Sequence, residues 1–304
     1  MERLRDPSNT TKIDSHTGLC CLIGNPIGHS ISPQIHNAAF KSLNLNFIYL
    51  AFQVEGDLEA AVEGLRALGA RGFNVTIPYK VSVMEHLDDL DDSAVEIGAV
   101  NTVLNRDGKL IGYNTDGKGF IRSIGVEAVK GGGVTVLGAG GAARAIVVES
   151  ARYASRIYVL NRSLEKAEAL AEEVLRRLNP GVKIKAMPLT PKSLREALKH
   201  SILLANATPV GMHPHVDMSP VPPGLLSREL TVFDAVYNPL ETRLLREARM
   251  AGARTVSGLD MLIHQGGEAF KIWTGIDPPL QIMRRAALKA LQGEASRVEV
   301  CRGA

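Results

Sequence analysis

The chain has 304 residues, of which 45% are hydrophobic and 22% are charged, and its formal net charge is +3. This composition is typical of a globular protein with one large domain or two average ones. So small a net charge argues against a nucleic-acid-binding surface, and no apolar run reaches the length of a membrane-spanning helix.

Residues 1–17 are polar and lack the apolar segment of a secretory signal, so we expect a disordered extension there. Cys20 and Cys21 are adjacent in an apolar run, and Cys301 lies in the C-terminal tail. This spacing fits no disulfide framework or metal motif, which indicates a cytoplasmic protein. The adjacent cysteines are most simply the two faces of a strand, and a redox role is the alternative.

The first third of the chain alternates apolar runs of strand length with amphipathic segments. Strands are expected at Leu19–Ile23, Phe47–Gln53 and Phe73–Ile77. The expected helices are one beginning at Ser32, one over Asp57–Leu68 capped by Asp57, a helical face made by Val81, Met84 and Leu87, and one over Asp91–Ile97. Asp107-Gly108 between two apolar runs predicts a hairpin.

Two serines precede the first helix. Ser32 is a good N-cap and Pro33 suits the first helical position, so capping alone explains Ser32. Ser30 is not needed for that cap, and two hydroxyls in this loop could bind a polyol or a carboxylate. The residues alone leave both interpretations open.

Lys80 and Asp116 are candidates for an acid–base pair. Lys80 follows a strand near a helix N-terminus, where a cation gains nothing from the helix dipole. Reduction of a ketone by hydride requires a proton donor at the developing alkoxide, and a lysine held by a carboxylate can fill this role in both directions. The alternatives are a solvated surface lysine, and Thr115 or Asp116 acting only as a helix cap.

Val134–Leu137 is an apolar strand that leads into the glycine-rich turn Gly138–Ala143. Gly138 permits a tight turn, Gly140 permits close approach of a pyrophosphate, and Ala143 allows the helix to pack on the strand. The N-terminus of the following helix, expected over Ala142–Tyr153, favours an anion. The pattern predicts a dinucleotide site, and a purely structural turn is the alternative.

Asn161 and Arg162 stand where an NAD-selective site usually carries an acidic residue. A guanidinium can pair with a 2′-phosphate, Lys166 can add a second cation, and Ser163 can cap the next helix and bind phosphate. The charges therefore favour NADP over NAD. A surface arginine is the alternative interpretation of Arg162.

The rest of the chain repeats the alternation of strand and helix. The expected strands are Arg156–Leu160, Lys183–Met187, Ile202–Ala205 and Thr231–Val236, and the expected helices are Leu164–Leu178, Pro191–Lys199, Leu240–Ala251, Leu259–Thr274 and Leu280–Leu291. Thr208 follows the carboxyl end of a strand and could face the cofactor. Gly258 could let the backbone approach the nicotinamide, and Gln265 could turn toward a ligand. His213 and His215 lack further ligands, so no metal site is expected.

This alternation predicts an α/β fold with parallel sheets. Residues 18–120 would form an α/β substrate domain, and residues 121–255 a Rossmann-type, doubly wound cofactor domain with a parallel sheet. Residues 256–304 would supply the C-terminal helices. The active site is expected between the two domains.

Seven short motifs resemble, in the same order, those of the shikimate dehydrogenase family, and the similarity covers about residues 19–290. The motifs are Gly24–His36, Asn74–Lys80, Gly98–Thr102, Gly112–Gly117, Gly138–Ala143, Asn206–Met212 and Met261–Gln265.

The resemblance implies the reversible reduction of 3-dehydroshikimate to shikimate with NADPH, on the route to chorismate and the aromatic amino acids. It implies that Lys80 is the general acid and base and Asp116 its partner, and that the last helices return to the first domain. The implied substrate contacts are Ser30, Ser32, Thr76, Asn101, Tyr237 and Gln265. The resemblance adds Asp92 to the candidate cofactor contacts. The full set is Asp92, Gly138, Ala139, Gly140, Gly141, Ala142, Asn161, Arg162, Ser163, Lys166, Thr208, Ala235 and Gly258.

Two rival functions remain at this point. One is a dehydrogenase for quinate, or for both quinate and shikimate. The other is a non-catalytic ligand sensor on the same scaffold, against which an intact Lys80 and Asp116 pair argues. The sequence leaves a homodimer open.

Overall fold

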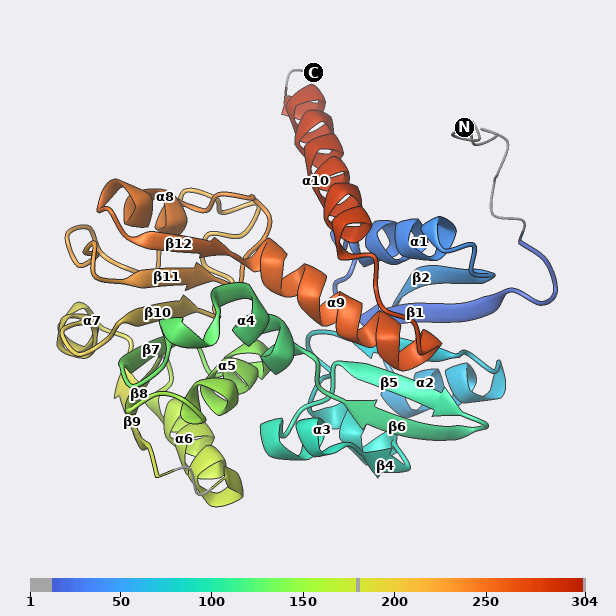
Figure 1. Ribbon diagram of the computed structural model, residues 1–304, viewed down its shortest axis with the longest axis horizontal. Helices are drawn as coiled ribbons and strands as arrows, with labels where there is room; N and C mark the ends of the chain where they lie inside the picture. The colour runs from blue at the N-terminus through green and yellow to red at the C-terminus, as the bar shows by residue number, and fades with distance from the viewer. Residues whose placement is uncertain (1–12, 179–180, 303–304) are drawn as a thin grey trace, which may run out of the picture.

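The computed structural model describes residues 13–178 and 181–302, with side chains through residue 293. Within that part the chain forms two α/β units, each built on a six-stranded sheet (Figure 1). Helix α9 (Gly258–Thr274) runs between the two units in Figure 1. The predicted α/β fold is confirmed.

The first sheet is formed by β1 (Gly18–Gly24), β2 (Phe47–Gln53), β3 (Gly72–Val75), β4 (Asp89–Leu90), β5 (Thr102–Arg106) and β6 (Lys109–Tyr113). Their order across the sheet is β2-β1-β3-β5-β6-β4. β1 pairs in parallel with β2 and β3, whereas β5 pairs antiparallel with β3 and β6.

The antiparallel pairs correct the expectation of a parallel sheet in this first unit. Asp107 and Gly108 form the hairpin between β5 and β6, and both have positive φ angles, 54° and 88°. A two-residue loop can join only antiparallel neighbours, so the predicted hairpin excludes an all-parallel sheet.

The second sheet is formed by β7 (Gly133–Leu137), β8 (Arg156–Asn161), β9 (Lys183–Pro188), β10 (Leu203–Asn206), β11 (Thr231–Asp234) and β12 (Arg254–Ser257). All its pairs are parallel, in the order β12-β11-β10-β7-β8-β9. The chain winds outward in both directions from β7, as the doubly wound prediction requires. Ligands of such sheets bind beyond the carboxyl ends of the strands at the reversal point, here between β7 and β10.

Helices cover both sheets. Those of the first unit are α1 (Ser32–Ser42), α2 (Leu58–Ala67), the 3-10 helix η1 (Ser82–His86) and α3 (Asp92–Ile97). The connecting segment carries α4 (Asp116–Ile124) and the 3-10 helix η2 (Val126–Ala128). The second unit has α5 (Gly141–Ala151), α6 (Leu164–Leu178), α7 (Pro191–Leu198) and α8 (Arg243–Met250), and α9 is followed by α10 (Leu280–Arg302).

The C-terminal helices pack on the first unit. Trp273 and Phe270 of α9 are fully buried in one apolar cluster with Phe40 of α1 and Tyr49 of β2. The Trp273 indole N–H also donates to the Val103 carbonyl of β5 at 2.9 Å. Aromatic side chains of this size contribute much of the apolar area that a core buries, so this cluster holds α9 to the first sheet.

Two ends of the chain differ from the sequence-based expectation. The predicted final helix ended at residue 291, but α10 continues to Arg302. Of the predicted disordered extension, residues 1–12 lie outside the described residues. Asp14–Thr17 forms a hydrogen-bonded turn, and the Thr17 hydroxyl donates to Asn46 Oδ1 at 2.8 Å. This part of the extension is therefore ordered.

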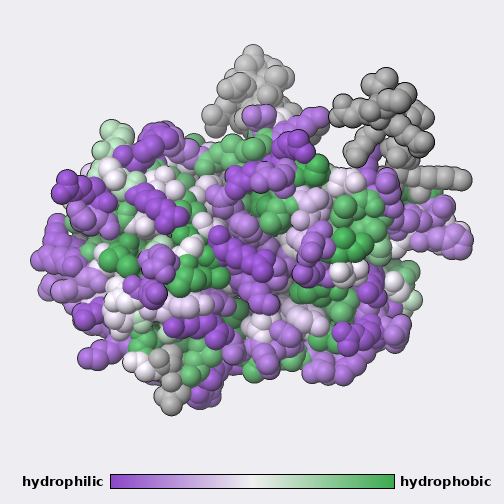
Figure 2. All heavy atoms as spheres, in the orientation of Figure 1, coloured by the Kyte–Doolittle hydropathy of each residue, from purple (hydrophilic) through white to green (hydrophobic). Residues whose placement is uncertain are grey.

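Among the described residues, none of the helices combines the length and the apolar composition needed to cross a bilayer. On the face drawn in Figure 2, hydrophobic residues lie in separate areas between hydrophilic ones.

Candidate active site

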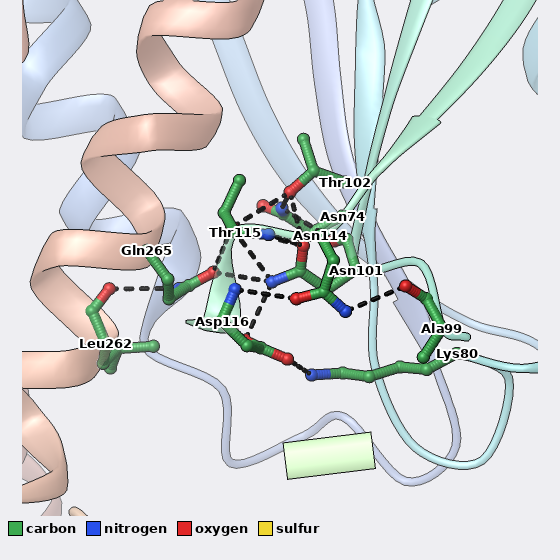
Figure 3. A network of polar contacts seen from close by, with 10 residues as sticks. All are labelled: Asn74, Lys80, Ala99, Asn101, Thr102, Asn114, Thr115, Asp116, Leu262 and Gln265. Atoms are coloured by element: carbon green, nitrogen blue, oxygen red, sulfur yellow. Dashed lines mark hydrogen bonds and ion pairs between the residues drawn. The ribbon is translucent and has the colours of Figure 1, made fainter. Parts of the chain in front are cut away.

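Lys80 and Asp116 are in direct contact, although 36 positions separate them in the chain (Figure 3). Lys80 lies in the loop after β3, and Asp116 is the first residue of α4. The Lys80 Nζ donates to Asp116 Oδ2 at 2.5 Å. The side chains are 16% and 7% exposed, so the pair is largely shielded from water. The structure brings the predicted acid–base candidates together.

Lys80 also reaches the second unit. A Cβ atom placed on Gly141, the first residue of α5, would lie 3.0 Å from Cδ of Lys80. The lysine stem therefore runs alongside the glycine-rich turn. The positive end of α5 and the ammonium repel each other, and the carboxylate of Asp116 offsets that repulsion.

Asn101 connects this pair to α9. Its Nδ2 donates to Asp116 Oδ1 at 2.8 Å and to Gln265 Oε1 at 3.3 Å. Asn101 is 3% exposed and directly precedes β5, and its side chain lies at the centre of the polar network drawn in Figure 3. Four of the predicted site residues, Lys80, Asn101, Asp116 and Gln265, thus form one hydrogen-bonded group.

The other predicted substrate residues lie in loops of the first unit or beside them. Thr76 follows β3 and lies against Gly24, where a Cβ atom would come within 2.3 Å of the Thr76 methyl carbon. Tyr237, in the loop after β11, packs against the apolar cluster of the first unit. Ser30 and Ser32 are both partly buried in the loop after β1 and at the start of α1.

The expected cap at Ser32 is wrong. The N-cap position of α1 is Ile31, and no side chain caps this helix. Instead, the Ser30 hydroxyl oxygen accepts the backbone N–H of Ser32 at 3.3 Å. Thr115 likewise occupies the N-cap position of α4 without a capping bond, because its backbone N–H and hydroxyl both donate to Asn101 Oδ1. For Thr115, a distant partner thus binds the hydroxyl where a local cap was expected.

The glycine-rich turn has the geometry that a dinucleotide needs. Gly138 has a φ angle of +109°, and a Cβ atom there would lie 3.1 Å from the Ala207 carbonyl oxygen. A Cβ atom on Gly140 would meet nothing within 4 Å, so the space above it is open. Ala139 and Ala142 flank this approach and are partly exposed. The residues present therefore fit a pyrophosphate beside the first turn of α5.

Three further predicted cofactor residues lie beyond neighbouring strands. Gly258 begins α9, and a Cβ atom there would lie 2.3 Å from the carbonyl oxygen of Ala235, so the two backbones touch. The Thr208 methyl group lies near Gly138, and its hydroxyl donates to Asn206 Oδ1 at 2.7 Å. All three residues follow β10, β11 or β12 at the carboxyl edge of the second sheet, where ligands of this fold bind.

Arg162 is exposed, and no other side chain of the described residues forms an ion pair with its guanidinium. It lines a hollow of about 420 Å³ together with Thr190, Ser219 and Arg243. Asn161 Nδ2 donates to the Ser163 carbonyl at 3.0 Å, and the Ser163 hydroxyl donates to Glu165. Arg162 thus offers an unpaired cation for a 2′-phosphate, and Lys166 lies exposed one turn into α6.

Asp92 stands apart from this group. It is exposed in the first turn of α3. The other end of this helix faces the second unit. There Glu96 pairs with Arg152, the residue that follows α5, and the Val95 carbonyl accepts a hydrogen bond from Arg177 of α6. Within the described residues, no hydrogen bond or ion pair joins Asp92 to the glycine-rich turn, so its place in a cofactor site stays a prediction.

Asp234 is a buried carboxylate that the sequence interpretation missed. It ends β11 and is 0% exposed. Its Oδ1 accepts from Asn206 at 2.9 Å and from the backbone N–H of Val236 at 3.1 Å, and its Oδ2 accepts from Thr242 at 2.7 Å. It thereby fixes the loops that carry Thr208 and Ala235. Burial raises the pKa of Asp234 to about 6, although the three hydrogen bonds oppose this shift.

The raised pKa of Asp234 predicts a specific pH dependence of stability. A carboxyl whose pKa is higher in the folded chain binds its proton more tightly there, so its contribution to stability falls as pH rises from about 4 to about 6 and is constant above. The Asp234→Asn variant has no carboxyl group there, so it lacks this pH-dependent contribution to stability. Its free energy of unfolding relative to the wild type should therefore rise between pH 4 and pH 7 by roughly 3 kcal/mol. Urea unfolding at both pH values measures the difference, and a pH-independent difference would contradict the buried-carboxylate interpretation.

The redox alternative for the adjacent cysteines conflicts with their burial. Cys20 and Cys21 are both free and 0% exposed in β1. Burial raises the pKa of Cys21 to about 12 and that of Cys20 higher still, so neither forms a thiolate near neutral pH. Among the described residues, no group of three His, Cys, Asp or Glu side chains could hold a metal ion.

Comparison with known proteins places this arrangement in a family. Residues 22–103 match the family described as "Shikimate dehydrogenase substrate binding domain", and residues 258–288 match "Shikimate 5'-dehydrogenase C-terminal domain". A shikimate dehydrogenase (NADP(+)) of Methanopyrus kandleri is 47% identical over 291 residues, which cover 94% of this chain and 100% of that protein.

Two solved structures show the same fold. A shikimate dehydrogenase crystallised in complex with NADP+ has a TM-score of 0.84 and 45% identity, covering 92% of this chain and 98% of the other. The quinate dehydrogenase of Corynebacterium glutamicum in complex with NAD has a TM-score of 0.83 and 30% identity, covering 90% of this chain and 99% of the other.

Proposed function

The chain belongs to the family of shikimate dehydrogenases, and from this premise we propose that it catalyses the reversible NADPH-dependent reduction of 3-dehydroshikimate to shikimate. Lys80 is the general acid and base in this proposal, and Asp116 is its partner. The observation that carries it is the Lys80–Asp116 contact of 2.5 Å, with the lysine stem lying against Gly141 at the start of the cofactor helix.

The mechanism needs one proton transfer at a fixed position. When bound, NADPH supplies a hydride to the carbonyl carbon of the ring. The Lys80 ammonium donates its proton to the alkoxide oxygen that develops, and the neutral amine takes the proton back in the reverse direction. Asp116 accepts a hydrogen bond from the Lys80 ammonium through Oδ2 and one from Asn101 Nδ2 through Oδ1. Because both carboxylate oxygens are bonded, the carboxylate is fixed and holds the ammonium in one orientation.

Substrate recognition rests on polar groups of the first unit and of α9. We propose that the hydroxyl and carboxylate groups of the substrate are bound by Ser30, Ser32, Thr76, Asn101 and Gln265. Tyr237 would contact the edge of the substrate ring. Hydroxyl and amide side chains suit a polyol because each both donates and accepts hydrogen bonds. The short contacts among Asn101, Asp116 and Gln265 support this assignment.

A spectrophotometric assay tests the proposed activity directly. Purified protein with shikimate and NADP should produce the absorbance of NADPH. Absence of that signal with either shikimate or quinate would leave the ligand-sensor alternative standing. Comparison of kcat/KM for the two polyols decides between shikimate and quinate, and the higher identity to shikimate dehydrogenases supports the former.

NADP fits the second unit better than NAD because of charge. The site has no carboxylate at Asn161 or Arg162 to accept the ribose 2′-hydroxyl, and the free guanidinium of Arg162 suits a phosphate. Lys166 adds a second, exposed positive charge in the first turn of α6. We propose that Gly138–Ala142, Ser163, Thr208, Ala235 and Gly258 complete the cofactor site, with Asp92 as an outlying member.

The Arg162→Gln variant should raise the KM for NADP by about 10- to 100-fold, the value of a charge-assisted hydrogen bond, and leave the KM for NAD within about twofold. Initial rates with each cofactor measure the effect. Arg228→Gln is the matched control, because Arg228 is an exposed arginine of the same unit, paired with Glu229 at 2.9 Å. Equal effects of Arg162→Gln on both cofactors would contradict the phosphate pairing.

The domain limits, location and assembly of the protein are also proposals. We propose a substrate domain over residues 18–120, a cofactor domain over residues 121–255, and C-terminal helices over residues 256–304 that belong with the substrate domain. The first of these limits falls inside α4, which packs against both α5 and α9. Two free, buried cysteines support a cytoplasmic location.

A homodimer is supported by the free edge of the first sheet. The edge strand β2 carries no charged residue, and its Leu50 and Phe52 side chains are exposed. Natural proteins usually protect such an edge with charges, proline or a covering partner, and a second copy of this chain would provide that cover.

A further inference from the structure

Thr102 lies directly behind the proposed active site without reaching it. It is the first residue of β5, it follows Asn101, and it is 0% exposed. Its hydroxyl oxygen accepts a hydrogen bond from Asn74 Nδ2 at 3.0 Å, and its hydroxyl proton is donated to Asn101 Oδ1 at 3.0 Å (Figure 3). Thr102 therefore contacts the site residue Asn101 from the buried side.

The direction of these hydrogen bonds is set further back, at Tyr49. The Tyr49 hydroxyl donates to Asn74 Oδ1 at 2.7 Å. Burial raises the pKa of Tyr49 well above its usual value, so this group stays a donor. Because Asn74 Oδ1 must accept, its Nδ2 must face Thr102, and the Thr102 proton is left for an acceptor on the other side. Asn101 Oδ1 lies nearer, at 3.0 Å, than the Thr115 hydroxyl oxygen, at 3.4 Å.

At Asn101 the same logic fixes the orientation of the amide. The backbone N–H of Thr115, which can only donate, points to Asn101 Oδ1 at 2.8 Å. Oδ1 thus receives donors from Thr102 and Thr115, and Nδ2 faces Asp116 Oδ1 at 2.8 Å. A flipped amide would set its NH2 group against these two donors and its oxygen against the carboxylate. The other oxygen of that carboxylate holds Lys80.

We infer that Thr102 is a positioning residue for the Lys80–Asp116 pair, an assignment that rests on the proposed function of that pair. Its hydroxyl locks the Asn101 amide, the amide fixes Asp116, and Asp116 directs the ammonium. Every bond in the series donates toward Asp116, from Tyr49 through Asn74, Thr102 and Asn101. A small displacement of a reacting group costs rate far more than it costs affinity for the cofactor.

Thr102→Val tests this assignment, because valine keeps the shape of the side chain and removes the hydroxyl. We expect kcat for shikimate oxidation to fall by about tenfold or more, with the KM for NADP changed by less than about twofold. Thr102→Ser restores the hydroxyl and should return kcat to within about threefold of the wild type. A kcat for Thr102→Val equal to that of the wild type would overturn the assignment.

Thr135→Val is the matched control for loss of a buried hydroxyl. Thr135 lies on β7, is 0% exposed, and shares a hydrogen bond of 2.8 Å with Ser201, remote from Asp116. Both valine variants should lower the melting temperature, but only Thr102→Val should lower kcat. An equal loss of kcat in the control would show that general destabilisation is the cause, and would also overturn the assignment.

A double mutant shows whether Thr102 acts through Asn101. Adding Thr102→Val to Asn101→Ala should lower kcat no further, since the amide that Thr102 orients is then absent.

If Thr102→Val does not fold, Tyr49→Phe removes the first donor of the series instead, and it too should lower kcat while the KM for NADP is preserved. Unchanged kcat in Tyr49→Phe would then overturn the assignment. An active wild type with an unaffected Thr102 variant rejects only this inference, whereas an inactive wild type rejects the proposed function.

Discussion

Lys80→Ala should lower kcat for shikimate oxidation by about 10³-fold, within the range that general acid–base catalysis contributes. The variant removes the only ammonium seen in contact with Asp116 among the described residues, so no side chain remains there to accept the substrate proton. Binding of shikimate should be affected less, because the hydroxyl and amide groups around the ring stay in place. Steady-state rates and calorimetric titration with shikimate measure the two effects separately.

Lys118→Ala is the control for this prediction. Lys118 is an exposed lysine on α4, two residues after Asp116, so its loss changes the net charge equally without touching the pair. Its kcat should stay within about twofold of the wild type. Near-normal turnover by Lys80→Ala would remove Lys80 from the mechanism, and loss of shikimate binding together with turnover would mean that Lys80 mainly binds.

Asp116→Asn should lower kcat by about 10²-fold and also destabilise the fold. The asparagine keeps the size of the side chain, but its NH2 group must face either Asn101 Nδ2 or the Lys80 ammonium, and both are donors. Removal of one member of a buried ion pair typically costs about 3–5 kcal/mol, because the other charge stays buried. Steady-state kinetics and urea unfolding measure the two losses.

Asp89→Asn is the matched comparison, because Asp89 pairs with Lys109 at 2.9 Å and both side chains are more than half exposed. An exposed pair of this kind contributes about 0–1 kcal/mol, and the variant should keep its kcat. If Asp116→Asn behaved like Asp89→Asn, neither the buried pair nor its role in directing Lys80 could be maintained.

Many elements could be predicted from the sequence because their causes are local. The helix over Leu164–Leu178 has the predicted bounds. Asp57 caps α2 by accepting from Ala60 N–H at 3.1 Å, and Asp107-Gly108 forms the predicted hairpin. A helix cap, a turn and an apolar periodicity each depend on residues within a few positions of one another, so the local sequence is enough to predict these elements.

Two local predictions differ from the structure, and for Thr115 the reason is a distant partner that competes with the local one. The side chain of Thr115 was a candidate helix cap, but it turns to Asn101, which is 14 positions away. Val81, Met84 and Leu87 suggested a helical face, and the chain forms the 3-10 helix Ser82–His86 there. The missed residues Asn74, Thr102 and Asp234 are polar groups at the ends of buried strands, and that position was the available signal.

The sequence by itself determined the alternation of strands and helices, the glycine-rich turn, the absence of a carboxylate beside Arg162, and the motifs of the family. Each of these features depends on residues that are close together in the chain. Only the tertiary structure decided that Lys80, Asn101, Asp116 and Gln265 meet, and in which direction each amide of the group points. The physical reason is that hydrogen bonds between segments far apart in the chain depend on how β3, β5, α4 and α9 pack, and no spacing along the chain encodes that packing.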